Sequence, residues 1–181
     1  MKVLILLFLI VNFMSCNPLD KRSPEVKRLE EHMESLDDDT LLGPDKNNDG
    51  VRDDVEYWIN NSKEIENNDI RRAALLYAKY LRNGLKYYND KEKSIANTYQ
   101  GLAYKDCFSL LFEPFSKKRT EIREYILNQI LNSKERTVAH LKADRNFAGK
   151  GGAMHMYANE ACPFKLEKRY QRRGERYVPK K

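Results

Sequence analysis

The chain has 181 residues, of which 41% are hydrophobic and 33% are charged, and its formal net charge is +6. This length and balance fit one small globular domain and exclude an intrinsically disordered chain. The charge is uneven, because residues 165–181 hold eight Lys or Arg against two Glu. The remainder of the chain is therefore neutral overall, and the basicity belongs to the C-terminal tail.

The first fifteen residues, MKVLILLFLIVNFMS, consist of a lysine close to the start followed by an apolar run. The run is too short to span a bilayer, and it ends in a small residue that suits cleavage. We therefore predict that residues 1–15 are a secretion signal.

The next residue is Cys16, and the sequence FMSC before and including it resembles the lipobox of bacterial lipoproteins. The small Ser15 precedes the cysteine as in that motif, although Phe13 stands where leucine is usual. The resemblance implies that Cys16 is lipidated, with residues 16–23 as a linker, and that two or more acyl chains anchor the protein stably in the bacterial envelope. Asn17 favours the outer membrane in a Gram-negative host. The alternative is an ordinary signal peptide followed by an incidental cysteine.

A first helix is expected from about Pro24 to Leu36, because Ser23 can cap it and proline suits a first helical turn. Gly43 and Pro44 oppose its continuation. A second helix is expected over the segment DDVEYWINN, with three apolar residues facing inward: Val55, Trp58 and Ile59.

Three longer segments follow, each with apolar residues at spacings of three and four. The first covers about 69–88 and can be capped by Asp69. The second covers about 91–112. The third starts near Lys117 and is weakly interrupted at Asn132-Ser133. The predicted inward faces are Ile70, Ala74, Tyr77, Leu81, Leu85 and Tyr88; Ile95, Tyr99, Leu102, Ala103, Leu110 and Leu111; and Ile122, Tyr125, Ile126, Ile130, Val138 and Leu141. On the first of these helices, Arg72, Lys79, Arg82 and Lys86 are expected to stay solvated.

No segment has a convincing strand pattern, so the predicted fold class is all-α. We expect a helical bundle of four or five helices over residues 24–164. Of the three cysteines, lipidation of Cys16 leaves Cys107 and Cys162 as one possible disulfide in an oxidising compartment. Such a bridge would stabilise the fold by about 4 kcal/mol in the chain-entropy model. The alternative is a pair of buried free thiols.

The segment Asp45–Glu56, DKNNDGVRDDVE, places oxygen donors at alternate positions around a glycine. Ca²⁺ takes about six to eight oxygen ligands, which a twelve-residue loop supplies from positions 1, 3, 5, 7, 9 and 12. Here those positions hold Asp45, Asn47, Asp49, the backbone carbonyl of Val51, Asp53 and Glu56. Gly50 stands at position 6, where a sharp turn requires glycine.

This segment resembles the EF-hand calcium loop at every ligand position. It departs from that family at Arg52, which replaces the usual aliphatic residue, and at Gly43-Pro44, which prevents a helix from leading into the loop. The sequence DGVRDDVE is closer to the calcium loops of thrombospondin type 3 repeats. The resemblance implies a solitary Ca²⁺ loop with an exit helix, structural rather than sensory. The alternative is a polar turn in which Asp53-Asp54 only caps the next helix.

No catalytic residues are expected, and the favoured function is a calcium-binding exported lipoprotein that acts as a structural or interaction module of the bacterial envelope. One alternative is a secreted hydrolase that uses His155 and Glu160, which lie near the glycine-rich AGKGGA. Another is a polyanion-binding protein whose basic tail meets anionic lipid or envelope polymers. Nucleic acid is not expected as a partner of an exported protein. A solvated, partly helical tail without a ligand also remains open.

Overall fold

The computed structural model describes residues 24, 27–29, 31–32, 40–113, 115–152 and 160–167, together with the backbone alone of 158–159, 170–173 and 176–179. The predicted signal peptide, Cys16 and the linker lie outside the described residues. Most of the helix expected from Pro24 to Leu36 also lies outside them, and its described residues are helical.

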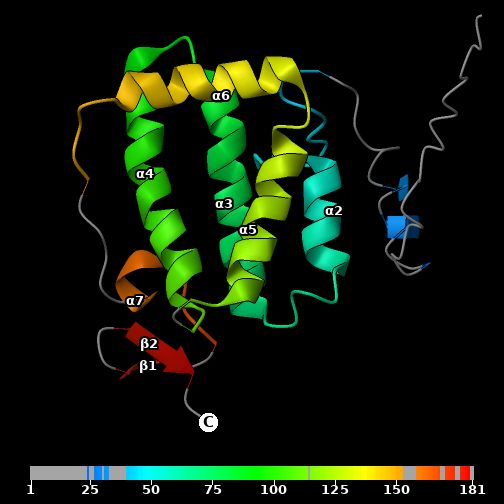
Figure 1. Cartoon of the computed structure of the whole chain (residues 1–181), viewed down its shortest axis with the longest axis vertical. Helices are drawn as coiled ribbons and strands as arrows, with labels where there is room; N and C mark the ends of the chain where they lie inside the picture. Colours follow the sequence, from blue (N-terminus) through cyan, green and yellow to red (C-terminus); the bar gives the residue numbers. More distant parts are fainter. Residues whose placement is uncertain are drawn as a thin grey trace, which may run out of the picture.

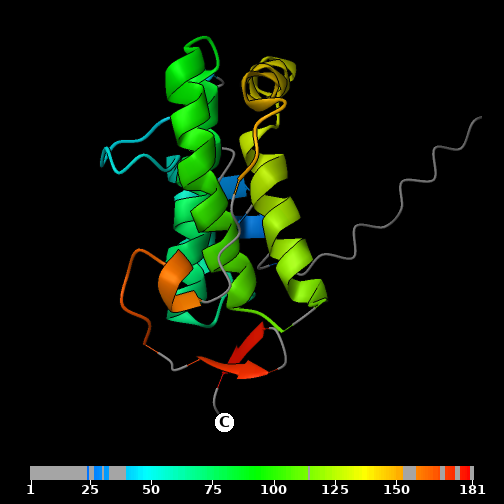
Figure 2. The same cartoon turned by 90° about the vertical axis from the view of Figure 1, so that its left-hand side faces the viewer.

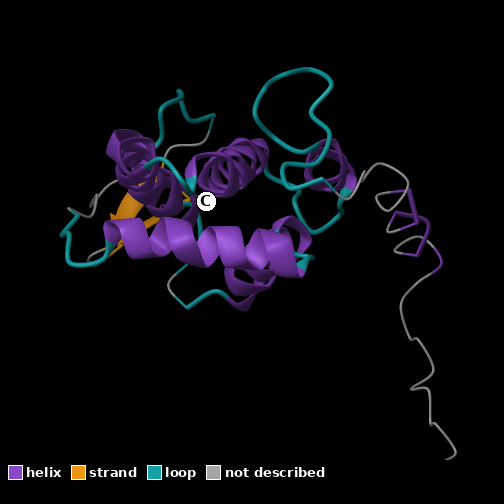
Figure 3. Ribbon diagram, turned by 90° about the horizontal axis from the view of Figure 1, so that it is seen from above, coloured by secondary structure: helices purple, strands orange, loops and turns teal. Residues whose placement is uncertain are grey.

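The described chain forms a helical bundle, as the sequence predicted. Its elements are α2 (Asp53–Asn61), α3 (Asn68–Tyr87), α4 (Lys91–Leu110), α5 (Lys117–Ile130), α6 (Lys134–Phe147) and the short α7 (Ala158–Ala161). Helices α2 to α5 lie side by side, and α6 crosses over the ends of α3 and α4 (Figure 1). Figure 3 shows this crossing from above. None of the helices in the described part of the chain is long and apolar enough to cross a bilayer.

Polar side chains set where the long helices begin. The side chains of Asn67, Asp90, Ser116 and Ser133 each accept a hydrogen bond from a backbone N–H in the first turn of α3, α4, α5 and α6. Asn67, rather than Asp69, therefore caps α3. The cap at Ser133 turns the weak interruption predicted at Asn132-Ser133 into a complete break between two helices.

The inward faces predicted for α2 and α3 are largely correct. Val55, Trp58 and Ile59 are buried on α2, and the Trp58 ring stacks on that of Tyr125 from α5, with centroids 4.0 Å apart. On α3 four of the six predicted residues are buried, and Ile70 and Tyr88 pack against the core at its edge. Both helices are strongly amphipathic, so their periodicity identifies the core face without tertiary information.

The inward face predicted for α4 is correct at the C-terminal end of the helix, where Leu111 is buried, and wrong in its first half. Tyr99 is 47% exposed, and the residues buried in the first half of α4 are small or polar: Ser94, Asn97, Thr98 and Gly101. Gly101 lies against the ring of Tyr80 on α3, and Asn97 Nδ2 donates a hydrogen bond of 3.1 Å to the Tyr80 carbonyl. Helices α3 and α4 therefore approach closely through small side chains whose polar atoms are satisfied by backbone carbonyls.

The inward face predicted for α6, which comprised Val138 and Leu141, is also wrong. Val138 is 42% exposed and Leu141 is 59% exposed, whereas Arg136, Ala139 and Ala143 face the bundle. The break before α6 turns this helix across the bundle, so α6 does not continue the direction of α5 (Figure 2). A stripe extrapolated from α5 therefore points to the wrong side.

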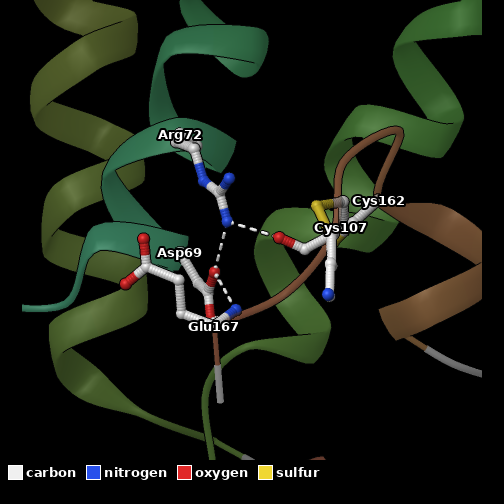
Figure 4. The surroundings of a disulfide bond; sticks show 6 residues. Asp69, Arg72, Cys107, Cys162 and Glu167 are labelled. Atoms are coloured by element: carbon white, nitrogen blue, oxygen red, sulfur yellow. Dashed lines mark hydrogen bonds and ion pairs between the residues drawn. A yellow bond between two sulfur atoms is a disulfide. The ribbon is translucent and has the colours of Figure 1, made fainter. Parts of the chain in front are cut away.

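Cys107 on α4 and Cys162 just after α7 form a disulfide across 55 residues, as predicted (Figure 4). The chain then reaches the N-terminal turn of α3, where the backbone N–H of Glu167 donates to both carboxylate oxygens of the buried Asp69 at 2.9 and 3.1 Å. Asp69 therefore fastens the C-terminal segment to α3.

Arg72 completes this attachment from the same turn of α3. Its Nη2 atom lies 2.7 Å from Asp69 Oδ1 and donates a 2.7 Å hydrogen bond to the Lys165 carbonyl. Its guanidinium also lies over the Phe164 ring, 4.2 Å from the centroid. Arg72 was expected to be solvated, and it instead bridges α3 to the segment that follows the disulfide.

The basic tail forms a two-stranded antiparallel hairpin, β1 (Tyr170–Arg173) and β2 (Arg176–Pro179), rather than the partly helical terminus considered from the sequence. Arg173 pairs with Arg176, so two residues, Gly174 and Glu175, separate the strands.

Candidate metal centre

The segment Asp45–Glu56 leads into α2 and turns sharply twice. Asn48 has φ 58° and Gly50 has φ 89°, both in the left-handed region. Asparagine tolerates that conformation, and the φ of 89° at position 6 favours glycine. A Cβ on Gly50 would also lie 2.9 Å from Lys79 Cε and displace that side chain. The turn predicted at Gly50 is therefore confirmed.

Four of the predicted ligand side chains are held by backbone N–H groups within the loop. The Asp45 carboxylate accepts 3.1 Å hydrogen bonds from the N–H groups of Asp49 and Gly50. Asn47 Oδ1 accepts from Asp49 N–H at 3.1 Å, and Asp49 Oδ1 accepts from Val51 N–H at 2.7 Å. The fourth side chain, Asp53, accepts a 3.0 Å hydrogen bond at Oδ1 from the Lys46 N–H. The predicted ligands are thus gathered around the loop's own backbone.

Asn47 joins positions 5 and 12 of the loop. Its Nδ2 atom donates hydrogen bonds of 3.1 Å to Asp49 Oδ2 and of 3.1 Å to Glu56 Oε2. The partly positive amide group therefore sits between two carboxylates that belong to the predicted ligand set.

The carboxylates of the loop lie close enough to repel one another. The pKa of Glu56 is raised, first by burial and next by the charge of Asp49, with further contributions from Asp53 and Asp45. The hydrogen bond from Asn47 opposes this rise. The three aspartates of the predicted site thus act electrostatically on Glu56 and disfavour its ionised form.

Two cations from α3 reach the loop, although the sequence was interpreted to leave them solvated. Arg82 Nη1 lies 3.0 Å from Asp45 Oδ2, and Arg82 Nε donates to the Leu42 carbonyl at 3.1 Å. Lys79 Nζ donates a 2.5 Å hydrogen bond to the Asp49 carbonyl. Both residues follow helical spacing, so only their position next to the loop distinguishes them from solvated charges.

Arg52, the departure at position 8, is 2% exposed. Its Nε and Nη2 atoms bind the two carboxylate oxygens of Asp54 at 2.6 and 2.5 Å, and Nη2 also donates to the Gln129 carbonyl of α5 at 2.8 Å. Asp54 therefore pairs with Arg52 and does not cap α2, whose N-cap residue is Arg52 and has no side-chain cap. The helix-capping alternative for Asp53-Asp54 does not describe this arrangement.

The oxygen donors fit a hard cation in two respects. Asp53 Oδ2 is buried and has no hydrogen-bond partner among the described residues, an arrangement that costs free energy unless a cation or donor reaches it. The Val51 carbonyl likewise accepts no hydrogen bond within the described part of the chain. As they stand, however, no three carboxylate, imidazole or thiolate groups of the described residues are close enough to hold a metal ion. A cation bound here would have to draw the carboxylates closer together and displace the Asn47 Nδ2 group, which now bridges Asp49 and Glu56.

The structure describes only part of the other candidate sites predicted from the sequence. His155 lies outside the described residues, and Glu160 is exposed on α7. The side chains of residues 168–181 also lie outside the described part, so the basic tail is seen only as a backbone hairpin. No family model matches this chain, and neither a curated protein nor a solved structure matches it.

Proposed function

We propose that the loop Asp45–Glu56 binds Ca²⁺ and that this ion stabilises the bundle of an exported, lipid-anchored protein of the bacterial envelope. The observation that carries the proposal is the buried Oδ2 of Asp53, which has no hydrogen-bond partner among the described residues and lies in the segment whose aspartates raise the pKa of Glu56. A cation would supply the missing partner and reduce the mutual repulsion of the acids.

A structural role follows from what the loop touches. Lys79 and Arg82 connect the loop to α3, and Arg52 connects it to α5 through the Gln129 carbonyl. The buried Arg136 of α6 donates to the Thr40 carbonyl just before the loop, with Nε at 3.1 Å. An ion in this loop would therefore fix a segment that four helices share, which supports a stabilising site in an interaction module rather than an enzyme.

Isothermal titration calorimetry tests the binding step. We expect the metal-stripped full chain to bind one Ca²⁺, with Mg²⁺ binding more weakly because it retains its waters and accepts fewer protein ligands. Glu56→Ala removes the ligand at position 12 and should abolish binding. Lys46→Ala is the matched control, because the exposed Lys46 contributes only its backbone N–H. Binding that persists in Glu56→Ala, or none in the wild type, contradicts the proposal.

The anchor requires a separate experiment. Lipidation at Cys16 is supported by the FMSC sequence and the apolar segment before it. Mass spectrometry of the mature N-terminus should find a diacylated or triacylated Cys16, and a Cys16→Ser variant should be released from membranes. An unmodified terminus beginning elsewhere would remove the anchor and leave the calcium proposal standing.

A further inference from the structure

A cavity of about 260 Å³ lies among α3, α4, α5 and α6, away from the acidic loop. Its floor is apolar and comes from three helices: Tyr77 and Leu81 of α3, Phe108 of α4 and Leu127 of α5. In Figure 2, α4 and α5 run lengthwise and α6 is seen end-on near the top. An apolar concavity of this kind with a few polar groups at its rim is typical of a small-molecule site.

Tyr77 brings one polar group to this floor. The residue is 4% exposed, and burial raises the pKa of its phenol to about 12. The hydroxyl is therefore protonated under physiological conditions. It makes no hydrogen bond with any residue that the structure describes, so it can donate one to a ligand.

The rim carries two cations without salt-bridge partners in the described part of the chain: Lys105 of α4 and Arg123 of α5. Lys105 Nζ lies 4.7 Å from the centroid of the Tyr80 ring, and burial lowers the pKa of Lys105. The acid at the rim, Asp144, is 3.6 Å from His140 Nε2 on the same helix, α6. The rim thus keeps a net positive charge, and its partly desolvated ammonium group favours an anion nearby.

We propose that this cavity binds a small organic anion, a carboxylate with an apolar body. The carboxylate lies between Lys105 and Arg123 and accepts a hydrogen bond from Tyr77, and the body packs on Leu81 and Phe108. A metal ion is a poor occupant, because the rim presents two cations and a single carboxylate. The volume suits one small molecule rather than a peptide or a polymer.

Phenylacetate is a suitable probe, and phenylacetamide is its neutral counterpart of nearly the same shape. Titration of the ¹⁵N-labelled full chain with phenylacetate should shift the amide signals of Tyr77, Lys105 and Phe108 together, with saturation. Phenylacetamide should bind at least tenfold more weakly. Lys105→Gln should weaken phenylacetate binding about tenfold, and Arg123→Gln should have a similar effect. Lys91→Gln on α4 and Lys118→Gln on α5, both exposed and away from the cavity, should leave binding unchanged.

Equal binding of the acid and the amide would overturn the proposal, and so would shifts scattered over the surface or an unaltered affinity in Lys105→Gln. Thermal melting of each variant separates loss of the site from loss of the fold. An acidic lipid headgroup offers the same chemistry from a membrane, so phosphatidylglycerol vesicles form a second arm. Lys105→Gln should not reduce co-sedimentation with them, and a reduction would assign the cavity to lipid and overturn the small-molecule proposal.

Discussion

Gly43 lies directly against the buried side chain of Arg52, and a Cβ atom at Gly43 would be 2.0 Å from Arg52 Cδ. Gly43 also has φ +64°, a conformation that L-residues rarely adopt. This contact places the stem of Arg52 so that its guanidinium reaches Asp54 and the Gln129 carbonyl. The Gly-Pro pair that ends the entering segment therefore also makes room for the arginine at position 8.

Gly43→Ala should lower the free energy of unfolding more than Gly149→Ala does. Both glycines have positive φ, which costs about 1–2 kcal/mol for alanine. Only Gly43 adds a steric overlap, worth about a further 1–3 kcal/mol, because nothing lies within 4 Å of a Cβ at Gly149. Urea denaturation of the two variants measures the difference. Equal losses would mean that Arg52 can move away at little cost.

Gly101 and Gly84 offer a second matched pair, both inside helices. A Cβ at Gly101 would be 2.1 Å from Tyr80 Cδ2, whereas the nearest atom to one at Gly84 is Asn97 Nδ2 at 3.9 Å. Gly84→Ala should stabilise the protein by about 0.5–1 kcal/mol through helix propensity alone. Gly101→Ala should destabilise it by about 1–3 kcal/mol, since α4 must move away from α3. Thermal denaturation with opposite shifts for the two variants confirms the close helix contact.

Calcium should raise the melting temperature of the wild type. Because the unfolded chain has no comparable site, free Ca²⁺ at about 100 times Kd adds roughly 2.7 kcal/mol to the free energy of unfolding. That corresponds to a few degrees for a domain of this size. Calorimetry in EDTA and in millimolar Ca²⁺ measures the gain, which Lys46→Ala should retain and Glu56→Ala should lose. Identical melting temperatures in the two buffers would leave the segment as a polar turn.

Arg82→Gln separates affinity for calcium from stability without it. Arg82 neutralises Asp45 at 3.0 Å, so its removal leaves the acid cluster more repulsive and should lower the melting temperature in EDTA. The same change removes a competing positive charge and should tighten Ca²⁺ binding several-fold. Lys86→Gln, on an exposed position of α3, should alter neither quantity. Weaker Ca²⁺ binding in Arg82→Gln would show that the arginine organises the site instead of competing with the ion.

Removal of the disulfide should release the C-terminal segment from the bundle. The double variant Cys107→Ser/Cys162→Ser should lose about 4 kcal/mol of stability by the chain-entropy model. Hydrogen exchange at the Glu167 amide should accelerate more than exchange in α3, because Asp69 holds that amide only while the segment is in place. Cys16→Ser is the control and should leave stability unchanged. Intact protection of Glu167 in the double variant would mean that Asp69 and Arg72 suffice.

Much of the fold was determined by the sequence alone. The positions of α2 to α5, the inward face of α3 and the turn at Gly50 each depend on the residues of one continuous segment. Helical periodicity, caps and glycine conformation are local properties, so they can be derived without knowing what each helix packs against. The cysteine pair was predictable from the expectation of export, because lipidation of Cys16 would leave two thiols. Calcium binding and lipidation remain predictions, supported by motif and by the chemistry of the loop.

Tertiary structure decided what local patterns cannot encode. The first half of α4 buries Asn97 and Gly101 because α3 crosses it closely, and the hydrophobicity of the helix does not distinguish that face. The residues of α6 that face the bundle depend on a change of direction at Ser133. Arg82 and Arg136 bind carbonyls just before the loop, and Arg52 within the loop binds the Gln129 carbonyl of α5, although all three look like solvated charges in the sequence. Burial of an arginine depends on acceptors from distant segments, and only the assembled helices bring those acceptors within reach.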